Sequence, residues 1–200
     1  MEIKRLDRIP PLVLASTSRY RRELLERLRL RFEVAAPDAD ETPLANESCA
    51  QMASRLAAAK ARSLHRRYPD ALIIGSDQVA DFDGHPVGKP GKFSTALRQL
   101  QAMRGRTVVF HTSVAVFDAR DGRLRIADVP TTVTFRSLQD DQLGRYLELD
   151  EPYDCAGSAK VESLGIVLAE RIESTDPTAL IGLPLIALTG LLFDAGISIF

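Results

Sequence analysis

The distribution of hydrophobic and polar positions predicts that strands and helices alternate along most of the chain. Short apolar runs, LVLA at 12–15 and LIIG at 72–75, have the length and composition of buried strands. After the first run, Tyr20, Leu24 and Leu28 recur every four positions, which is the spacing of an amphipathic helix. By the same criteria we predict strands at 12–16, 32–35, 71–77, 107–118, 123–136 and 165–172, and helices at 19–29, 48–66, 94–104, 138–149 and 179–193.

Turn and capping residues divide these elements at definite points. Asp83 and Gly84 lie between two short extended segments and predict a type I′ hairpin. Ser137 and Asp140 have the spacing of a capping box for the helix at 138–149. Helical crossovers together with a long antiparallel pair predict an α/β domain with a mixed sheet. We find no repeat or linker, so we expect one domain over 1–200 with a core at about 12–195.

Composition and charge argue against several classes of protein. The 200 residues carry a net charge of −1, so no overall field attracts the chain to nucleic acid or to a membrane surface. Cys49 and Cys155 are far apart and form no C-x-x-C pair, which disfavours a disulfide scaffold or a zinc site. The first residues, MEIKRLDRIPP, lack the apolar region of a secretion signal. The apolar segment at 179–193 is too short for a membrane span and contains Pro184, so we expect a cytoplasmic protein.

The first turn of the helix at 19–29 is basic. Ser18 is a candidate N-cap, because its hydroxyl can accept a free backbone N–H. Arg19, Arg21 and Arg22 then lie at the positive end of the helix dipole, where each misplaced charge costs up to about 1 kcal/mol. A bound anion would offset this cost, and a solvated basic face explains the same residues equally well. This stretch alone leaves both interpretations open.

Polar residues follow two of the predicted buried strands. The first strand runs into Ser16, and the strand at 71–77 runs into Ser76, Asp77 and Gln78. Ligands of open α/β sheets bind beyond the carboxyl ends of strands, so both positions are candidate site positions. The chain contains neither G-x-x-x-x-G-K-[ST] nor G-x-G-x-x-G, so a P-loop or a Rossmann dinucleotide site is not supported.

Several charged groups could take part in chemistry, and each also has an ordinary structural explanation. Asp77 could hold a metal or act as a base, or it could cap a turn. Glu41, beside Asp40 in a proline-flanked loop, could be a simple surface acid. Lys60 borders the apolar face of its helix, which snorkelling explains. Lys89 lies in a GKP turn that could be exposed to solvent.

Taken together, these residues suit one type of reaction. Two carboxylates, a small opening with oxygen ligands and several Arg and Lys side chains are what Mg²⁺-assisted phosphoanhydride chemistry requires. The basic helix turn would then be a cradle for a triphosphate. His65, His85 and His111 show no ligand or triad spacing, and we assign them to structural or surface positions.

Seven short motifs occur in the order and spacing of one known family. They are LVLASTSRYRRELL, DADETP, AAAKARS, IIGSDQV, GKP, CAGS and IGLPL. The resemblance that they carry extends from about residue 12 to 193. By these motifs the chain resembles the Maf family of nucleoside triphosphate pyrophosphatases. The resemblance implies an elongated α/β fold with a mixed sheet flanked by helices, similar to that of the inosine triphosphatases. It also implies hydrolysis of the α–β phosphoanhydride bond with a divalent cation, Mg²⁺ or Mn²⁺, and a homodimer.

The resemblance implies roles for individual residues. Asp77 of the SDQ stretch corresponds to the catalytic base. Glu41 of DETP corresponds to a metal ligand, and Asp77 is expected to share that role. The residues implied to contact the triphosphate are Ser16, Arg21, Lys60 and Lys89, together with Arg22.

Within the family, the chain resembles the branch that hydrolyses 7-methyl-GTP to 7-methyl-GMP and diphosphate, a house-cleaning activity that limits incorporation of modified nucleotides. Tyr20, Gln78 and Glu162 stand where the pyrimidine-directed branch typically has arginine, threonine and glutamine. The chain departs from the usual pattern at Arg19, where proline is common, and at Tyr20, where tryptophan is expected. These departures leave the catalytic residues unchanged and alter the shape of the base pocket.

Other functions remain as alternatives. The first is a dTTP and UTP pyrophosphatase of the same family, which the residues Tyr20, Gln78 and Glu162 disfavour. The second is a nucleotide-binding regulator of septum formation without enzymatic activity, which would not need the carboxylates and cations. A nucleic-acid-binding module ranks last, because no aromatic platform beyond Tyr20 and Phe32 interleaves the arginines.

Overall fold

The computed structural model describes residues 10–200. Residues 1–9, which contain most of the charged stretch from which we expected no secretion signal, lie outside the described part. The strands are β1 (Leu12–Ala15), β2 (Glu33–Ala35), β3 (Leu72–Phe82), β4 (His85–Val87), β5 (Thr107–Asp118), β6 (Leu124–Phe135) and β7 (Ala169–Ser174). They form one mixed sheet in the order β2-β1-β3-β5-β6-β7, with β4 paired to β3. β1 is parallel to β2 and β3, whereas β3, β5, β6 and β7 are successively antiparallel.

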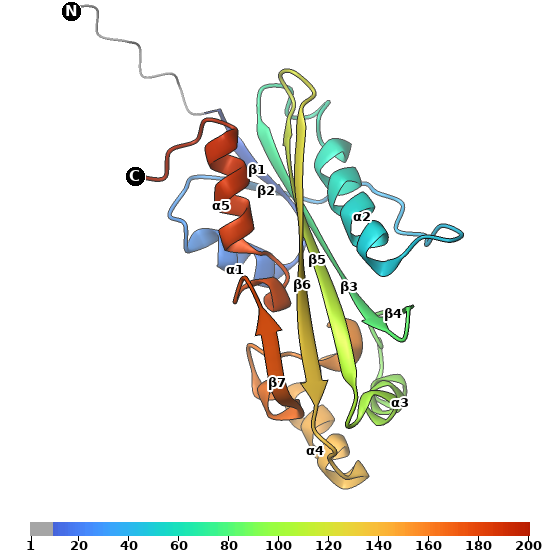
Figure 1. The fold of residues 1–200 in the computed structure, drawn as a ribbon. Coiled ribbons are helices and arrows are strands. Elements are labelled where there is room, and N and C mark those ends of the chain that lie inside the picture. The colour runs from blue at the N-terminus through green and yellow to red at the C-terminus, as the bar shows by residue number, and fades with distance from the viewer. Residues whose placement is uncertain (1–9) are drawn as a thin grey trace, which may run out of the picture.

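The helices lie on both faces of this sheet and at one end of it. They are α1 (Arg19–Glu26), α2 (Cys49–Ser63), α3 (Phe93–Met103), α4 (Asp140–Asp150) and α5 (Leu185–Asp194), with the 3-10 helices η1 (Ala156–Ser158), η2 (Leu164–Leu168) and η3 (Ala179–Ile181). In Figure 1, α2 lies on one side of the long strands, α1 and α5 lie on the other, and α3 and α4 lie at the far end near β7. The long strands β3, β5 and β6 connect the two ends, so the molecule is elongated, as the resemblance implied (Figure 1).

Burial explains why the first strands are continuously apolar. Val13 and Ile73 belong to the core under α2, whereas their neighbours Leu14 and Ile74 belong to the core under α1 and α5. Successive strand residues point to opposite faces, so a strand covered on both faces must be apolar at every position. At the far end, α3 and α4 close a separate apolar core around Phe110.

Gly75 allows α2 to approach β3 closely. A Cβ atom at Gly75 would lie 2.2 Å from the backbone oxygen of Ala57 and 2.7 Å from the backbone nitrogen of Ala61, which no side chain could tolerate. Lys60 stands on this stretch of α2, and Asp77 follows Gly75 by two positions on β3. The small residue therefore brings a lysine and an aspartate from separate elements into contact.

The predicted strands and helices are present, with differences at several of their ends. The helix predicted at 138–149 begins at Asp140, and its capping box uses Gln139 and Gln142 rather than Ser137 and Asp140. The box predicted at Ser137 is wrong, because the helix has not yet begun there and the backbone N–H of Gln139 donates to the side-chain Oε1 of Gln142 at 2.9 Å. Asp83 and Gly84 both have positive φ, as the predicted type I′ hairpin requires.

The strand predicted at 165–172 is correct only in its second half. Residues 164–168 form η2, and β7 begins at Ala169. A Cβ at Gly165 would lie 2.5 Å from the backbone of Lys160, so the chain is folded back on itself there and cannot pair with β6. The apolar segment at 179–193 is divided between η3 and α5, which begins at Leu185 after Pro184. Over residues 10–200, no helix combines the length and the hydropathy that crossing a membrane requires.

Candidate active site

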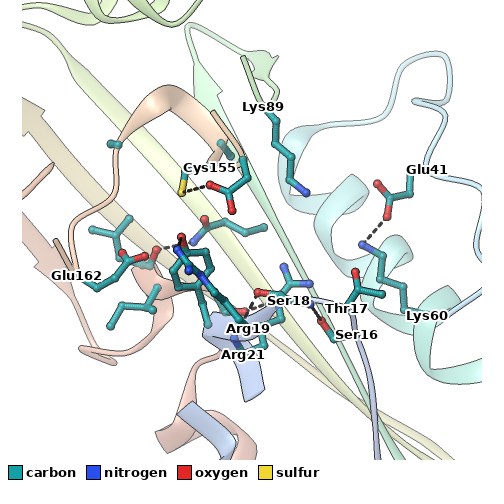
Figure 2. A pocket seen from close by; sticks show the side chains of 18 of the residues that line it. Ser16, Thr17, Ser18, Arg19, Arg21, Glu41, Lys60, Lys89, Cys155 and Glu162 are labelled. Carbon is teal, nitrogen blue, oxygen red and sulfur yellow. Dashed lines mark hydrogen bonds and ion pairs between the residues drawn. The ribbon is translucent and has the colours of Figure 1, made fainter. Parts of the chain in front are cut away.

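A cavity of about 440 Å³ opens between the carboxyl end of β1, the first turn of α1, α2, and the loops around η1 and η3. Its volume lies in the range of small-molecule sites. Figure 2 shows Lys60 and Glu41 at one side of this cavity and Glu162 at the other, with Ser18 and Arg19 between them. The carboxyl end of β1 therefore borders a cavity, as expected. The second strand does not end where the sequence predicted, because β3 continues to Phe82 and Asp77 and Gln78 lie within it. Gln78 lines the cavity, and Asp77 contacts the cavity residue Lys60.

The loop after β1 is held by its own hydroxyl groups. The buried Ser16 Oγ accepts a hydrogen bond from the backbone N–H of Ser18 at 3.1 Å. Ser18 Oγ accepts from the N–H of Arg21 at 3.4 Å, which confirms Ser18 as the N-cap of α1. The first turn of α1 thereby presents its backbone and its arginines to the cavity.

Arg21 lies partly buried at the floor of the cavity. Its Nε donates to the carbonyl oxygen of Gly182 at 2.9 Å, and Ser76 Oγ lies 2.9 Å from the same carbonyl. Burial lowers the pKa of Arg21 from its usual value, and the charges of Asp77 and Glu41 act in the opposite direction. An arginine loses its proton only far above neutral pH, so this contact fixes a positive charge beside the two carboxylates.

Lys60 joins two carboxylates from different parts of the chain. Its side chain is only 8% exposed, and Nζ lies 2.6 Å from Asp77 Oδ1 and 2.7 Å from Glu41 Oε1 (Figure 2 shows the second contact). The hydrogen bond from Lys60 is the main cause of a lowered pKa at Glu41, with smaller effects of Lys89 and Arg21. The apolar-face position of Lys60 noted in the sequence thus reflects a buried ion pair.

The same two carboxylates are the groups that could hold a metal ion. Within residues 10–200, Asp77 Oδ2 and Glu41 Oε2 accept no hydrogen bond, so each carboxylate keeps a free oxygen. In that range no three His, Cys, Asp or Glu residues are arranged to hold a metal. A site with two carboxylates fits Mg²⁺, which takes its other ligands from water and substrate phosphates.

The other side of the cavity carries Tyr20, Gln78 and Glu162. Gln78 Nε2 lies within hydrogen-bond distance of Thr112 Oγ1 at 2.9 Å and of the carbonyl oxygens of Ala179 and Leu180 at 3.1 and 3.0 Å. These contacts orient the amide so that its oxygen is the free group. Burial raises the pKa of Glu162, so its carboxylate takes up a proton more readily than an ordinary glutamate.

Tyr20 is surrounded by positive charge. The Arg19 guanidinium lies 4.7 Å from the centroid of the Tyr20 ring, and its Nη2 donates to the phenol oxygen at 2.8 Å. Lys160 Nζ lies 5.9 Å from the same centroid. Sequence reasoning predicted the tyrosine and missed both cations, because Lys160 is distant in sequence and the arginine stacks on its own neighbour.

The structure does not bring Arg22 to this cavity. Its Nε pairs with Glu26 at 2.9 Å on the exposed side of α1, and it borders a separate groove with Phe32. Arg19, Tyr20 and Arg21 line the cavity, whereas Arg22 lines the separate groove. The structure therefore places Arg22 in a surface ion pair, and its expected contact with the triphosphate stays a prediction.

The remaining candidates divide between the cavity and the surface. Lys89 is exposed and lines the cavity from the loop after β4. Asp40 lies outside the cavity and accepts from the backbone N–H of Thr42. The histidines lie apart from the cavity lining, as expected, and His111 Nδ1 lies 3.1 Å from Asp128.

Two cavity residues had sequence signals that we did not use. Gly182 belongs to IGLPL and supplies the carbonyl that holds Arg21. Cys155 belongs to CAGS and lines the cavity, and burial raises its pKa to about 12, so the thiol is protonated and is not a nucleophile at neutral pH. The motifs IGLPL and CAGS support the resemblance, but the sequence predicted no role for Gly182 or Cys155.

Comparisons with known proteins agree with the motifs. Residues 11–195 match the family model described as Maf-like protein. A protein named 7-methyl-GTP pyrophosphatase from Cupriavidus metallidurans is 59% identical over 97% of this chain and 98% of its own length. Proteins of the same name from Ralstonia nicotianae and Aromatoleum aromaticum are 58% and 57% identical over 96% and 95% of this chain, and over 98% of each of their own lengths.

Proposed function

The chain belongs to the Maf family, and we propose that it is a hydrolase that converts 7-methyl-GTP to 7-methyl-GMP and diphosphate. The proposal rests above all on one cavity with two chemically different ends. The phosphate end is formed by Ser16, Arg21, Glu41, Lys60, Asp77 and Lys89. The base end is formed by Tyr20, Gln78 and Glu162. The names of the relatives support the same substrate.

At the phosphate end, Asp77 is the proposed general base. Its free Oδ2 takes a proton from water, whose oxygen attacks the α-phosphorus while the bond to the bridging oxygen breaks. The bonding electron pair leaves with diphosphate, and the charge that develops there is neutralised by Lys60, Lys89 and Arg21. The contact with Lys60 Nζ at 2.6 Å fixes the direction of the Asp77 carboxylate.

A divalent cation, Mg²⁺ or Mn²⁺, is part of this proposal. Glu41 would hold it through its free Oε2, with the Asp77 carboxylate as the second ligand group, and when bound it would supply Lewis-acid polarisation of the phosphate oxygens. With only two carboxylates, the protein itself offers few ligands. The metal is therefore expected to bind more tightly in the presence of the triphosphate than in its absence.

At the base end, the proposed substrate carries a positive charge on its imidazole ring and N–H donors on its Watson–Crick edge. The Glu162 carboxylate accepts from such donors, with a typical worth of roughly 1.5–3 kcal/mol for a hydrogen bond to a charged group. The free amide oxygen of Gln78 is a second acceptor. The ring of Tyr20 supplies the stacking surface.

The family resemblance alone supports the proposed location, oligomeric state and partners. We propose a cytoplasmic homodimer that removes modified nucleotides from the nucleotide pool. The proposed partners are the nucleoside triphosphate and a second copy of the chain, with neither nucleic acid nor membrane involved.

The deciding experiment measures diphosphate release from 7-methyl-GTP, GTP, UTP and dTTP by the purified protein with Mg²⁺ or Mn²⁺. We expect the highest kcat/KM for 7-methyl-GTP. Faster hydrolysis of UTP or dTTP would assign the chain to the pyrimidine-directed branch. Binding of the same nucleotides without diphosphate release, under both metals, would favour a regulator without enzymatic activity.

A further inference from the structure

The base end poses an electrostatic problem for the proposed substrate. The Tyr20 ring already has the Arg19 guanidinium at 4.7 Å and the Lys160 ammonium at 5.9 Å from its centroid. A cationic methylguanine that stacks on this ring would be repelled by both. The exposed Arg19 can move into solvent, but Lys160 has a side chain only 17% exposed and needs another position within the protein.

Asp150 offers that position. It ends α4, its side chain is 7% exposed, and its Oδ1 accepts from Ser163 Oγ at 2.5 Å. Lys160 Nζ lies 3.8 Å from Oδ1, which is too long for a hydrogen bond. Within residues 10–200, the second oxygen, Oδ2, is buried without a hydrogen-bond partner. A buried carboxylate oxygen without a donor is costly, and the Lys160 ammonium beside this carboxylate is a donor that could turn toward it.

The backbone around Lys160 is fixed, so only the side chain is free to shift. The Tyr146 hydroxyl donates to the carbonyl oxygen of Ser158 at 3.1 Å and accepts from the backbone N–H of Lys160 at 3.2 Å. On the other side, the backbone of Gly165 packs directly against that of Lys160. The Lys160 ammonium can therefore move between the Tyr20 ring and the Asp150 carboxylate without a change in the backbone.

We propose that Asp150 is a positioning residue for base selection, which draws the Lys160 ammonium off the Tyr20 ring so that a cationic base can stack there. This inference rests on the proposed function. Lys160 paired to Asp150 removes a like charge from the ring and from the path to Glu162. A neutral guanine gains much less from the same movement, because no charge on the base is repelled.

The test compares 7-methyl-GTP with GTP, which differ at this end by one methyl group and one positive charge. The variants are Asp150→Asn, Lys160→Met and the double variant, with Asp141→Asn in the exposed first turn of α4 as the matched control. The readout is the ratio of kcat/KM for the two substrates, measured with the full chain and Mg²⁺. Thermal unfolding of each variant reports separately on folding.

We expect Asp150→Asn to lower the ratio roughly tenfold and Lys160→Met to raise it roughly tenfold, as a single charge near the base would. In the double variant the ratio should return to the Lys160→Met value, because without the ammonium no counter-ion is needed. If Asp150 had a purely structural role, Asp150→Asn would lower kcat/KM equally for both substrates, and the loss would remain in the double variant. Either result overturns the inference. If Asp150→Asn does not fold, the Lys160→Met variant is sufficient for the test, and an unchanged ratio in that variant overturns the inference.

The same data separate this inference from the proposed function. If the wild-type protein does not hydrolyse 7-methyl-GTP, the proposed function and the role of Asp150 are both wrong. If the wild-type protein prefers 7-methyl-GTP but the ratio of kcat/KM for 7-methyl-GTP and GTP is the same in the variants at positions 150 and 160, only the role of Asp150 is wrong.

Discussion

The two ends of the cavity are built from different parts of the fold. At the phosphate end, Lys60 and Asp77 stand on a helix and a central strand and are in contact at 2.6 Å. At the base end, Glu162 stands between two 3-10 helices, and Lys160 approaches its counter-ion only to 3.8 Å. The pKa values differ in the same way: an ion pair lowers that of Glu41, whereas burial raises that of Glu162.

This difference indicates how reaction and specificity are divided. Charges fixed by regular elements are preorganised and lose little energy to rearrangement when the substrate reacts. Charges on a loop can change partners, which suits recognition of one base among several. We therefore expect substitutions at the phosphate end to change the rate for every nucleotide, and substitutions at the base end to change the order of preference.

The largest effect is expected at Asp77. Asp77→Asn keeps the size and an acceptor for Lys60 but removes the proton acceptor, and loss of a general base typically lowers kcat about 10²–10⁴-fold. All nucleotides should be affected alike, because the base end is unchanged. Diphosphate release measures this, with Asp83→Asn in the exposed turn after β3 as the control. A loss confined to 7-methyl-GTP would break the division between the two ends.

The next effect is expected in the metal titration. Glu41→Gln removes one of two carboxylates, and we expect the Mg²⁺ concentration for half activity to rise at least about tenfold, with activity recovered at high Mg²⁺. Asp40→Asn is the matched control, because the neighbouring side chain lies outside the cavity and keeps its contact with Thr42. Equal metal curves for the two variants would remove Glu41 from the metal site.

The phosphate end was more predictable from the sequence than the base end for a physical reason. The end of β1 and the first turn of α1 have fixed geometry, so Ser16 and Arg21 could be placed beside one another in advance. Asp77 was expected at a strand end and lies instead within β3, which continues to Phe82. Arg22 lies outside the cavity although Arg19 and Arg21 of the same helix turn line it, so a basic first turn does not by itself show which arginine faces the site. The contacts of Tyr20 with Lys160 could not be foreseen, because they depend on how an irregular loop folds back.

The fold shows the same limit. Periodicity located the strands and helices, because apolar spacing follows directly from which faces are buried. It failed at 164–168, where an apolar run coils because Gly165 packs on the backbone of Lys160. No local pattern encodes such a contact between two backbones.

A smaller effect is expected from pH at the base end. An acid with a raised pKa is charged above that pKa and loses its charge as the pH falls through it, so Glu162 is protonated before Glu41. The preference for 7-methyl-GTP over UTP should therefore decline as the solution is acidified below neutral. In Glu162→Gln the preference for 7-methyl-GTP over UTP should be low at every pH. Any pH dependence that remains should come from titration of the nucleotides themselves. A wild-type ratio with the same pH profile as this variant would contradict the role of Glu162, and Glu170→Gln on β7 controls for a general loss of charge.

The smallest effects compare two cations that the sequence treated alike. Lys89→Ala should lower kcat/KM about five- to tenfold for every triphosphate, since it removes one partly solvated charge from the phosphates. It should leave inhibition by 7-methyl-GMP nearly unchanged, because the monophosphate lacks the groups that Lys89 faces.

Arg22→Ala should change both quantities less than about twofold, because an exposed i,i+4 pair with Glu26 contributes at most about 0.5 kcal/mol. Competition assays with the monophosphate and diphosphate-release kinetics measure both variants side by side. If Arg22→Ala costs as much as Lys89→Ala, the first turn of α1 must rotate when the triphosphate binds, and the phosphate end would be less rigid than its ion pairs indicate.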